Sequence, residues 1–375
     1  MSDRAIPPET RQAVRDCQRS LPAAFDEGDL AFGFDGIVDN VRVMVDTRHS
    51  PTEFDRLATL ADLRDRLDAS IASESSLTVE WEMEGKRTGG HACHLARAFN
   101  TLGADTTMIG TYGRPPREPF VSEFDDSTLV SIGAPGYCDA VEFDDGKLLI
   151  TETSEALELD WEMLRDRLDP GTLADHLDGT DVFGVGYWNM TAALPDLLAT
   201  LVAETWPRQE SPPDHVFFDP GDIRSLPGET LREGARRLET ANETVPITVS
   251  ANRSETEALA AALAGGDPET LADAARTAGA ELGVDRLVGH SASRAVVVSG
   301  GDATAVEVPT TDAPAMTTSA GDHFNVGFLL GHLAGLSDPA ATVVANAVAG
   351  SFVRTGSPPD YDDIAAFVDD YLAKF

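Results

Sequence analysis

The second half of the chain repeats a strand-then-helix pattern, and this alternation limits the possible folds more than any other feature. The β-rich runs DVFGVGYW, HVFFDP, PITVSA, RLVGHS and RAVVVSG are separated by helical patterns such as TEALAAALAG and PETLADAARTAGAEL. Such alternation predicts a mostly parallel sheet covered by helices. In sheets of this kind, ligands bind at the carboxyl ends of the strands.

Three exposed strand patterns do not fit this buried sheet. They cover residues 36–48, 78–88 and 137–153, and the last contains a hairpin around Asp144-Asp145-Gly146. We expect them to form a small discontinuous β-sheet that projects from the main domain as a lid. Other expected elements are a helical extension within residues 1–30 (helix over 8–24), a strand over 30–45, helices over 52–71, 324–334 and 340–354, and a main domain over 31–375.

The charge balance is very acidic, with 64 acidic residues against 28 basic ones and a formal net charge of −36. This charge argues against a nucleic-acid partner, because it repels phosphate backbones. The acids are spread along the whole chain, which indicates adaptation to high salt, since salt screens their repulsion. Three separated cysteines, a polar MSDRAIPPET start and the lack of a long apolar run predict a cytoplasmic protein without a membrane partner.

The common phosphate-binding motifs are absent. Neither Gly-Lys pair continues as the GK[ST] of a P-loop, and Gly184-Val185-Gly186 has Asn189 where a dinucleotide fingerprint needs its third glycine. Phosphate chemistry in this chain therefore requires another device.

The stretch TTSAGDHF offers one. Ser319, Ala320 and Gly321 are small and precede an apolar helical pattern, so their unpaired N–H groups would point at one spot in front of a helix dipole. Asp322 is either a helix cap, which is common for Asp, or a general base toward an alcohol beside that anion site. A serine-hydrolase elbow is disfavoured because no histidine follows His332 to complete a Ser–acid–His order.

Three further motifs have both a structural and a functional interpretation. Gly89-Gly90 permits close backbone approach before a helix that carries His91, Cys93 and His94; we favour a polar substrate contact by His94 over zinc binding or a plain helix surface. Asp35 and Asp39 either form a solvated turn or bind sugar hydroxyls. Asn252 and Glu255 form either a capping box or a pair that organises hydrated Mg²⁺ near phosphates.

Taken together and in this order, these motifs resemble those of the ribokinase/PfkB family of carbohydrate kinases, from about Ala31 to Gly356. The family pattern D-T-x-G-A-G-D-x-F matches residues 316–324, with Met316 for Asp and Ser319 for Gly, and G-G-x-x-x-N-x-A matches residues 89–96, with His94 for Asn. N-x-x-E matches residues 252–255. The segment ANAVAGSFVRTG resembles the helix beside the adenine pocket and points to Asn346.

The resemblance implies a ribokinase-like three-layer α/β/α sandwich with a β-sheet lid. It implies Asp322 as general base, the amides of residues 319–322 as anion hole, and Asp39, Gly89, Gly90 and His94 as the sugar site, to which we add Asp35 from its place beside Asp39 at the end of the first strand. It also implies Asn252, His290 and Asn346 at the nucleotide, and Glu255 acting on Mg²⁺ through water.

The sequence constrains the identity of the phosphoryl donor and of its acceptor less closely. Chain length favours ATP, whereas RLVGHSASRAVVV resembles the strand end, with His290, of ADP-dependent archaeal sugar kinases. His94 and nearby arginines such as Arg87, Arg97 and Arg114 favour an acceptor that already carries phosphate, with ribose 1-phosphate first and other sugars or nucleosides behind it. A non-catalytic sugar- or nucleotide-binding regulator is the alternative of another class. A homodimer through the lid is compatible with a projecting sheet.

Overall fold

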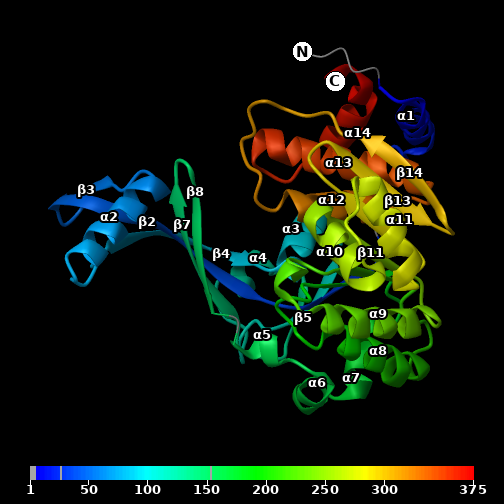
Figure 1. Cartoon of the computed structure of the whole chain (residues 1–375). Helices are drawn as coiled ribbons and strands as arrows, with labels where there is room; N and C mark the ends of the chain where they lie inside the picture. The colour runs from blue at the N-terminus through cyan, green and yellow to red at the C-terminus, as the bar shows by residue number, and fades with distance from the viewer. Residues whose placement is uncertain (1–5, 26–27, 153) are drawn as a thin grey trace.

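The computed structural model describes residues 6–25, 28–152 and 154–375 (Figure 1). Its main sheet has nine strands, in the order β14-β13-β12-β11-β10-β9-β1-β5-β6. Each neighbouring pair from β12 through β11, β10, β9, β1 and β5 to β6 is parallel. Strands β13 and β14 add an antiparallel edge beside β12. The strands are β1 (Leu30–Phe34), β5 (Thr106–Gly110), β6 (Thr128–Ser131), β9 (Val182–Gly186), β10 (His215–Asp219), β11 (Ile247–Asn252), β12 (Arg286–His290), β13 (Arg294–Ser299) and β14 (Asp302–Glu307).

Helices cover both faces of this sheet, and each face has its own apolar core. One face packs against α1 (Pro8–Ser20), α3 (His91–Thr101), α4 (Phe120–Glu123), α12 (Ala320–Leu333), α13 (Asp338–Thr355) and α14 (Tyr361–Asp369). The other packs against α6 (Trp161–Arg167), α7 (Pro170–Leu177), α8 (Leu194–Thr205), α9 (Gly228–Asn242), α10 (Arg253–Ala264) and α11 (Leu271–Leu282). The predicted three-layer α/β/α architecture is thus confirmed. In the described part of the chain, no helix combines the length and apolarity needed to cross a membrane.

A second sheet projects from this body (Figure 1). We call it the lid sheet; it consists of β2 (Ile37–Ser50), β3 (Glu53–Arg56), β4 (Glu80–Gly89), β7 (Gly136–Phe143) and β8 (Gly146–Glu152). Helix α2 (Leu60–Ala72) packs on it over a small core that includes Met44, Leu63 and Phe143. The last residue of the predicted lid segments, Thr153, lies outside the described residues, and the short α5 (Ser154–Glu158) follows it.

Three sequence predictions need correction. The strand expected over 30–45 is two strands, β1 in the main sheet and β2 in the lid sheet, because the chain turns at Gly36, where a β-carbon would lie 2.5 Å from the carbonyl oxygen of Thr111. The helix expected from residue 52 begins at Leu60, and residues 53–56 pair with β2 instead. The edge strand β14 was not predicted.

The amino-terminal helix α1 joins the other end of the chain. Thr10 Oγ1 accepts a hydrogen bond from the Glu307 amide in β14, and Gln18 donates to the carbonyl oxygens of Val368 and Asp369. Residues 1–5 of the predicted extension lie outside the described residues.

Candidate active site

The carboxyl ends of the parallel strands meet at one edge of the main sheet. Strand β9 ends at Gly186, which pairs in register with Phe34 on one side and Asp219 on the other. Asn252 at the end of β11 likewise pairs with His290 at the end of β12. The residues that end or follow these strands therefore line up across the sheet, where α/β proteins bind their ligands.

Helix α12 begins at this edge, after a strained residue. Ser319 is its N-cap, with φ 65° and ψ 12°, and its side chain makes no capping hydrogen bond. The left-handed region costs a non-glycine residue about 1–2 kcal/mol. This conformation explains why the pattern that the chain resembles has glycine here. The following amides, of Ala320, Gly321 and Asp322, lie in the first turn of α12, where N–H groups lack helical partners, although the Ala320 N–H donates to the Thr317 carbonyl oxygen at 3.3 Å.

Asp322 does not cap this helix. Its Oδ1 atom accepts a hydrogen bond from the Tyr187 hydroxyl, with 2.5 Å between the oxygens. The residue is only 7% exposed, and burial raises the pKa of its carboxyl, while the Tyr187 hydrogen bond and nearby His91 act in the opposite direction. Asp322 is thus a buried carboxylate in front of a helix amino terminus, a suitable arrangement for accepting a proton.

Two aspartates lie against the glycine pair that precedes α3. A β-carbon on Gly90, whose φ is 95°, would lie 2.5 Å from Asp35 Oδ2, and one on Gly89 would lie 2.5 Å from Asp39 Oδ2. Glycine at both positions therefore lets each carboxylate approach the backbone.

The two aspartates have different surroundings. Asp35 is fully buried and accepts hydrogen bonds from the amides of His91 (2.7 Å) and Ala92 (3.0 Å) at the start of α3. Burial raises the pKa of Asp35 to about 7. Asp39 on β2 is partly exposed, and desolvation raises its pKa. The structure therefore ties Asp35 to the helix and leaves Asp39 accessible.

His94 connects the glycine pair to α12. Its Nε2 lies 3.5 Å from Ser319 Oγ, and its Nδ1 is 3.1 Å from Nη1 of Arg97. Burial and the Arg97 guanidinium lower the pKa of His94 to about 3, so the imidazole is neutral at neutral pH. Because Arg97 donates to Nδ1, the ring proton is on Nε2, the atom that faces Ser319.

Arg97 is itself fully engaged. It donates to Glu123 Oε1 (2.5 Å) and to the carbonyl and hydroxyl oxygens of Thr88 (2.8 and 2.6 Å). These contacts hold α3 against β4 and use most of the N–H donors of Arg97. The structure therefore gives Arg97 a structural task, unlike the phosphate contact that the sequence suggested.

Sequence reasoning missed three residues here. Asp219, at the end of β10, is 8% exposed and accepts hydrogen bonds from Gly221 N (2.8 Å) and Asn325 Nδ2 (2.6 Å). Tyr187 follows β9, and His91, expected on a helix surface, is fully buried with both ring nitrogens lacking a hydrogen-bond partner in the described structure. The signal that found Asn252, a polar residue after a predicted parallel strand, also marks Tyr187 and Asp219.

His91, Asp219 and Asp322 form a compact group. One ligand atom from each lies within 4.8 Å of the others, a spacing compatible with a shared cation. His91 Nδ1 is 3.7 Å from Asp219 Oδ2, beyond hydrogen-bond distance.

On the opposite face of the main sheet from α12, the start of α10 is capped. Asn252 accepts from Glu255 N (3.1 Å), Glu255 Oε2 accepts from Asn252 N (2.7 Å), and the Asn252 side-chain amide also donates to Glu255 Oε1. The capping-box interpretation is therefore confirmed. Glu255 is 7% exposed, and burial raises its pKa to about 7.

Comparison with known proteins identifies this architecture. The model of the family described as prokaryotic ketohexokinase matches residues 6–371. The chain belongs to this family. A ketohexokinase of Haloferax volcanii is 43% identical over 366 residues, which are 98% of this chain and 97% of that protein.

Solved structures show the same fold at low identity. Ribokinase of Thermotoga maritima has a TM-score of 0.62 at 17% identity, covering 92% of this chain and 100% of that one. Arabidopsis thaliana ribokinase, solved with ribose and ATP, has a TM-score of 0.62 at 15% identity, covering 92% and 99%. The chain is therefore a carbohydrate kinase of the ribokinase/PfkB type. Neither the regulator nor the hydrolase interpretation is needed.

In this ketohexokinase-family kinase, the two other residues predicted at the nucleotide, His290 and Asn346, have different surroundings. His290 is partly exposed, stacks on Phe324 with 4.5 Å between ring centroids, and lies beside Gly321, whose added β-carbon would be 3.5 Å from His290 Cε1. Asn346 is 2% exposed, and its amide donates to the Tyr371 hydroxyl (2.9 Å). The structure therefore places His290 next to the start of α12 but buries Asn346 as a packing residue, away from solvent.

Proposed function

We propose that this kinase transfers the γ-phosphoryl group of ATP to a hydroxyl of a ketohexose, with Asp322 as general base. The observation that carries the proposal is the position of Asp322. Its carboxylate lies at the amino terminus of α12, next to amides that lack helical partners. Those amides suit the negative charge of a transferred phosphoryl group, and phosphoryl transfer depends mainly on positioning and charge stabilisation.

The sugar is assigned to the side of α12 that faces the lid sheet. Asp39 supplies a partly exposed carboxylate, Gly89 and Gly90 let the carboxylates of Asp39 and Asp35 approach the backbone, and His94 supplies a neutral imidazole. Neutral and anionic oxygen and nitrogen groups of this kind hydrogen-bond sugar hydroxyls. Asp35 acts here by holding the start of α3, through the amides of His91 and Ala92.

A free ketohexose fits these surroundings better than ribose 1-phosphate, our first inference from the sequence. Arg97 is engaged by Glu123 and Thr88 and His94 is uncharged, so neither is a free cationic donor for a bound phosphate, and the exposed Arg87 lies opposite Asp39, whose carboxylate it offsets. The name of the Haloferax volcanii relative supports the same choice.

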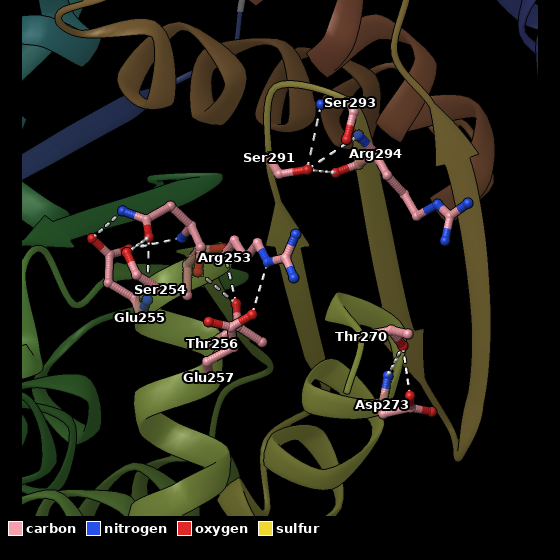
Figure 2. Close-up of polar contacts among 12 residues, drawn as sticks. Arg253, Ser254, Glu255, Thr256, Glu257, Thr270, Asp273, Ser291, Ser293 and Arg294 are labelled. Atoms are coloured by element: carbon pink, nitrogen blue, oxygen red, sulfur yellow. Dashed lines mark hydrogen bonds and ion pairs between the residues drawn. The ribbon is translucent and has the colours of Figure 1, made fainter. Parts of the chain in front are cut away.

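The nucleotide is assigned to the opposite side, near β11 and β12. A cavity of about 190 Å³ there is lined by Arg253, Ser291, Ser293, Arg294 and four further residues. Figure 2 shows the start of α10 on one side of this region and the β12–β13 turn on the other. ATP is the proposed donor, and ADP is the alternative that a donor screen would test. We place His290 and Asn252 between this cavity and α12.

The donor set around Glu255 fits hydrated magnesium. Its carboxylate is buried, and Asp222 lies close enough to raise the pKa of Glu255 further, although Arg224 opposes this. Oxygen ligands that leave room for water are what Mg²⁺ prefers. Glu255 would hold Mg²⁺ through water, and the ion would neutralise charge on the donor phosphates.

In the proposed step, the acceptor hydroxyl loses its proton to Asp322 while its oxygen bonds to the γ-phosphorus. The bond from that phosphorus to the β,γ-bridging oxygen breaks, and ADP leaves. The amides of residues 319–322 face the charge on the transferred group. Asp322→Asn removes the proton acceptor and should lower kcat by at least about 100-fold with nucleotide binding intact. Ordinary turnover of fructose and ATP by that variant would contradict the assignment.

We also propose that the lid sheet mediates a homodimer. Its outer strand β8 exposes Leu149 (58%) and Ile150 (51%), which are successive residues and so face opposite sides of the strand. Exposed apolar side chains on an edge strand favour pairing with another chain. Sedimentation of the wild type as a dimer and of Leu149→Glu as a monomer would support this; a monomeric wild type would contradict it.

A further inference from the structure

Tyr187 occupies an unusual place for a tyrosine beside a base. It follows the central strand β9, and its partly exposed side chain reaches across to α12, where its hydroxyl donates to Oδ1 of Asp322 at 2.5 Å. Its ring also meets that of His91 edge-on, with 5.4 Å between centroids. The hydrogen bond therefore joins two elements that are 135 residues apart in sequence.

We propose that Tyr187 is a positioning residue for Asp322, which orients the carboxylate by holding Oδ1 and leaves Oδ2 to accept the proton of the sugar hydroxyl. The inference rests on the proposed function, because it assumes that Asp322 is the base. A hydrogen bond that fixes one oxygen of a carboxylate also fixes the rotation of the other, which aids a near-attack geometry.

Tyr187 itself keeps its proton during this step. Burial and the neighbouring carboxylates of Asp322 and Asp219 raise the pKa of its hydroxyl well above the usual range. The phenol can then only donate to Asp322, so the proton of the acceptor hydroxyl goes to Asp322 Oδ2 while the Tyr187 O–H bond stays intact.

The Tyr187 hydroxyl lowers the pKa of Asp322, whereas most of the surroundings raise it. Burial is the main cause that raises the pKa of this carboxyl, and the carboxylates of Asp35 and Asp219 also face the site. Tyr187 is the largest opposing influence, followed by His91 on α3 and His323 on α12. Removing the hydroxyl must therefore raise the pKa of Asp322, so that the base is protonated at higher pH than in the wild type.

The test is the pH profile of kcat/KM for fructose at saturating ATP and Mg²⁺ in the full-length protein, for Tyr187→Phe and the control Tyr361→Phe. The control removes a hydroxyl that donates to the Pro22 carbonyl oxygen. We expect the acidic limb of Tyr187→Phe to move up by about one pH unit, with roughly 10-fold lower activity on that limb and recovery at alkaline pH. The control should follow the wild type.

An acidic limb at the wild-type position in Tyr187→Phe would overturn the inference. If that variant does not fold, replacing all five tyrosines with 3-fluorotyrosine gives a second measurement. The more acidic phenol is a stronger donor, so the limb should move to lower pH, and an unmoved limb would again overturn the inference.

Asp322→Asn separates the two hypotheses. If it is inactive while the Tyr187 profile is unshifted, only the role of Tyr187 fails. If it is active, the base assignment itself fails.

Discussion

Gly89 on β4 and Asp39 on the paired strand β2 lie so close that a β-carbon on Gly89 would lie 2.5 Å from Oδ2 of Asp39. Gly89→Ala must therefore move this carboxylate from its position. If Asp39 binds the sugar, we expect KM for fructose to rise about 10-fold, the effect of losing roughly one hydrogen bond to a charged group, with KM for ATP unchanged. Initial-rate kinetics with each substrate varied would measure both values.

Gly85→Ala is the matched control for this change. Gly85 lies on the same strand, and nothing lies within 4 Å of a β-carbon there. Equal fructose KM values in the two variants would show that Asp39 does not bind the sugar.

His94 should contribute a hydrogen bond that does not depend on pH. Since its pKa is about 3, the imidazole stays neutral as the pH rises from about 5 to 8, and its charge cannot alter sugar binding in that window. We expect His94→Ala to raise the fructose KM about 3–10-fold at every pH, and His94→Asn, which restores the residue of the related pattern, to recover most of the loss. A fructose KM whose pH dependence disappears in His94→Ala would mean that the imidazole titrates.

Ser319 should be strained in the folded protein. Its φ of 65° is unfavourable for a residue with a β-carbon, so Ser319→Gly should raise the free energy of unfolding by about 0.5–1 kcal/mol, after the greater unfolded-state freedom of glycine is subtracted. Ser319→Ala keeps the strain and should change it little. Urea unfolding would measure all three proteins, and a Ser319→Gly variant less stable than Ser319→Ala would contradict the expectation.

Glu255→Gln should weaken the response to magnesium. Glutamine can preserve the capping box at the start of α10, but it removes the buried negative charge. We expect the Mg²⁺ concentration for half-maximal activity to rise about 10-fold at fixed ATP. Glu257→Gln, which alters a partly exposed residue of the same helix that pairs with Arg253, is the control. Identical Mg²⁺ curves for the two variants would remove Glu255 from the proposed magnesium site.

The acidic surface should make stability depend on salt. With a formal net charge of −36, self-repulsion is strong at low ionic strength and is screened as salt increases. Thermal unfolding midpoints should therefore rise continuously from dilute buffer to molar potassium chloride. A midpoint that is insensitive to salt, or falls with it, would contradict adaptation to a saline environment.

Local patterns in the sequence predicted the candidate site residues whose partners lie close to them in the sequence. Asn252 and Glu255 are three positions apart at the junction of β11 and α10, and Ser319 to Asp322 are consecutive, so spacing alone suggested a shared site. The break between β1 and β2 was missed because both flanking runs are rich in apolar and β-branched residues, and only contact between Gly36 and Thr111 shows why the chain turns there.

The residues that were missed depend on pairings between distant strands. Tyr187 reaches Asp322 only because β9 lies inside the sheet, and Asp219 joins it only because β10 pairs with β9 in register. For Asn346 the sequence predicts a nucleotide contact, and the structure adds a buried hydrogen bond that the sequence did not indicate. Its surroundings resemble a nucleotide-binding helix in sequence, but its amide faces Tyr371 near the carboxyl end of the chain.

The docking of α1 against β14 and the carboxyl-terminal segment sets an order on folding during synthesis. Thr10 and Gln18 are among the first residues made, yet their partners Glu307 and Val368 are among the last. At about 5–20 residues per second, the ribosome adds the chain between them in roughly 15–75 seconds. The first helix to leave the ribosome therefore waits, with its apolar face uncovered, until the final helices have been made, and its docking marks the completion of the fold.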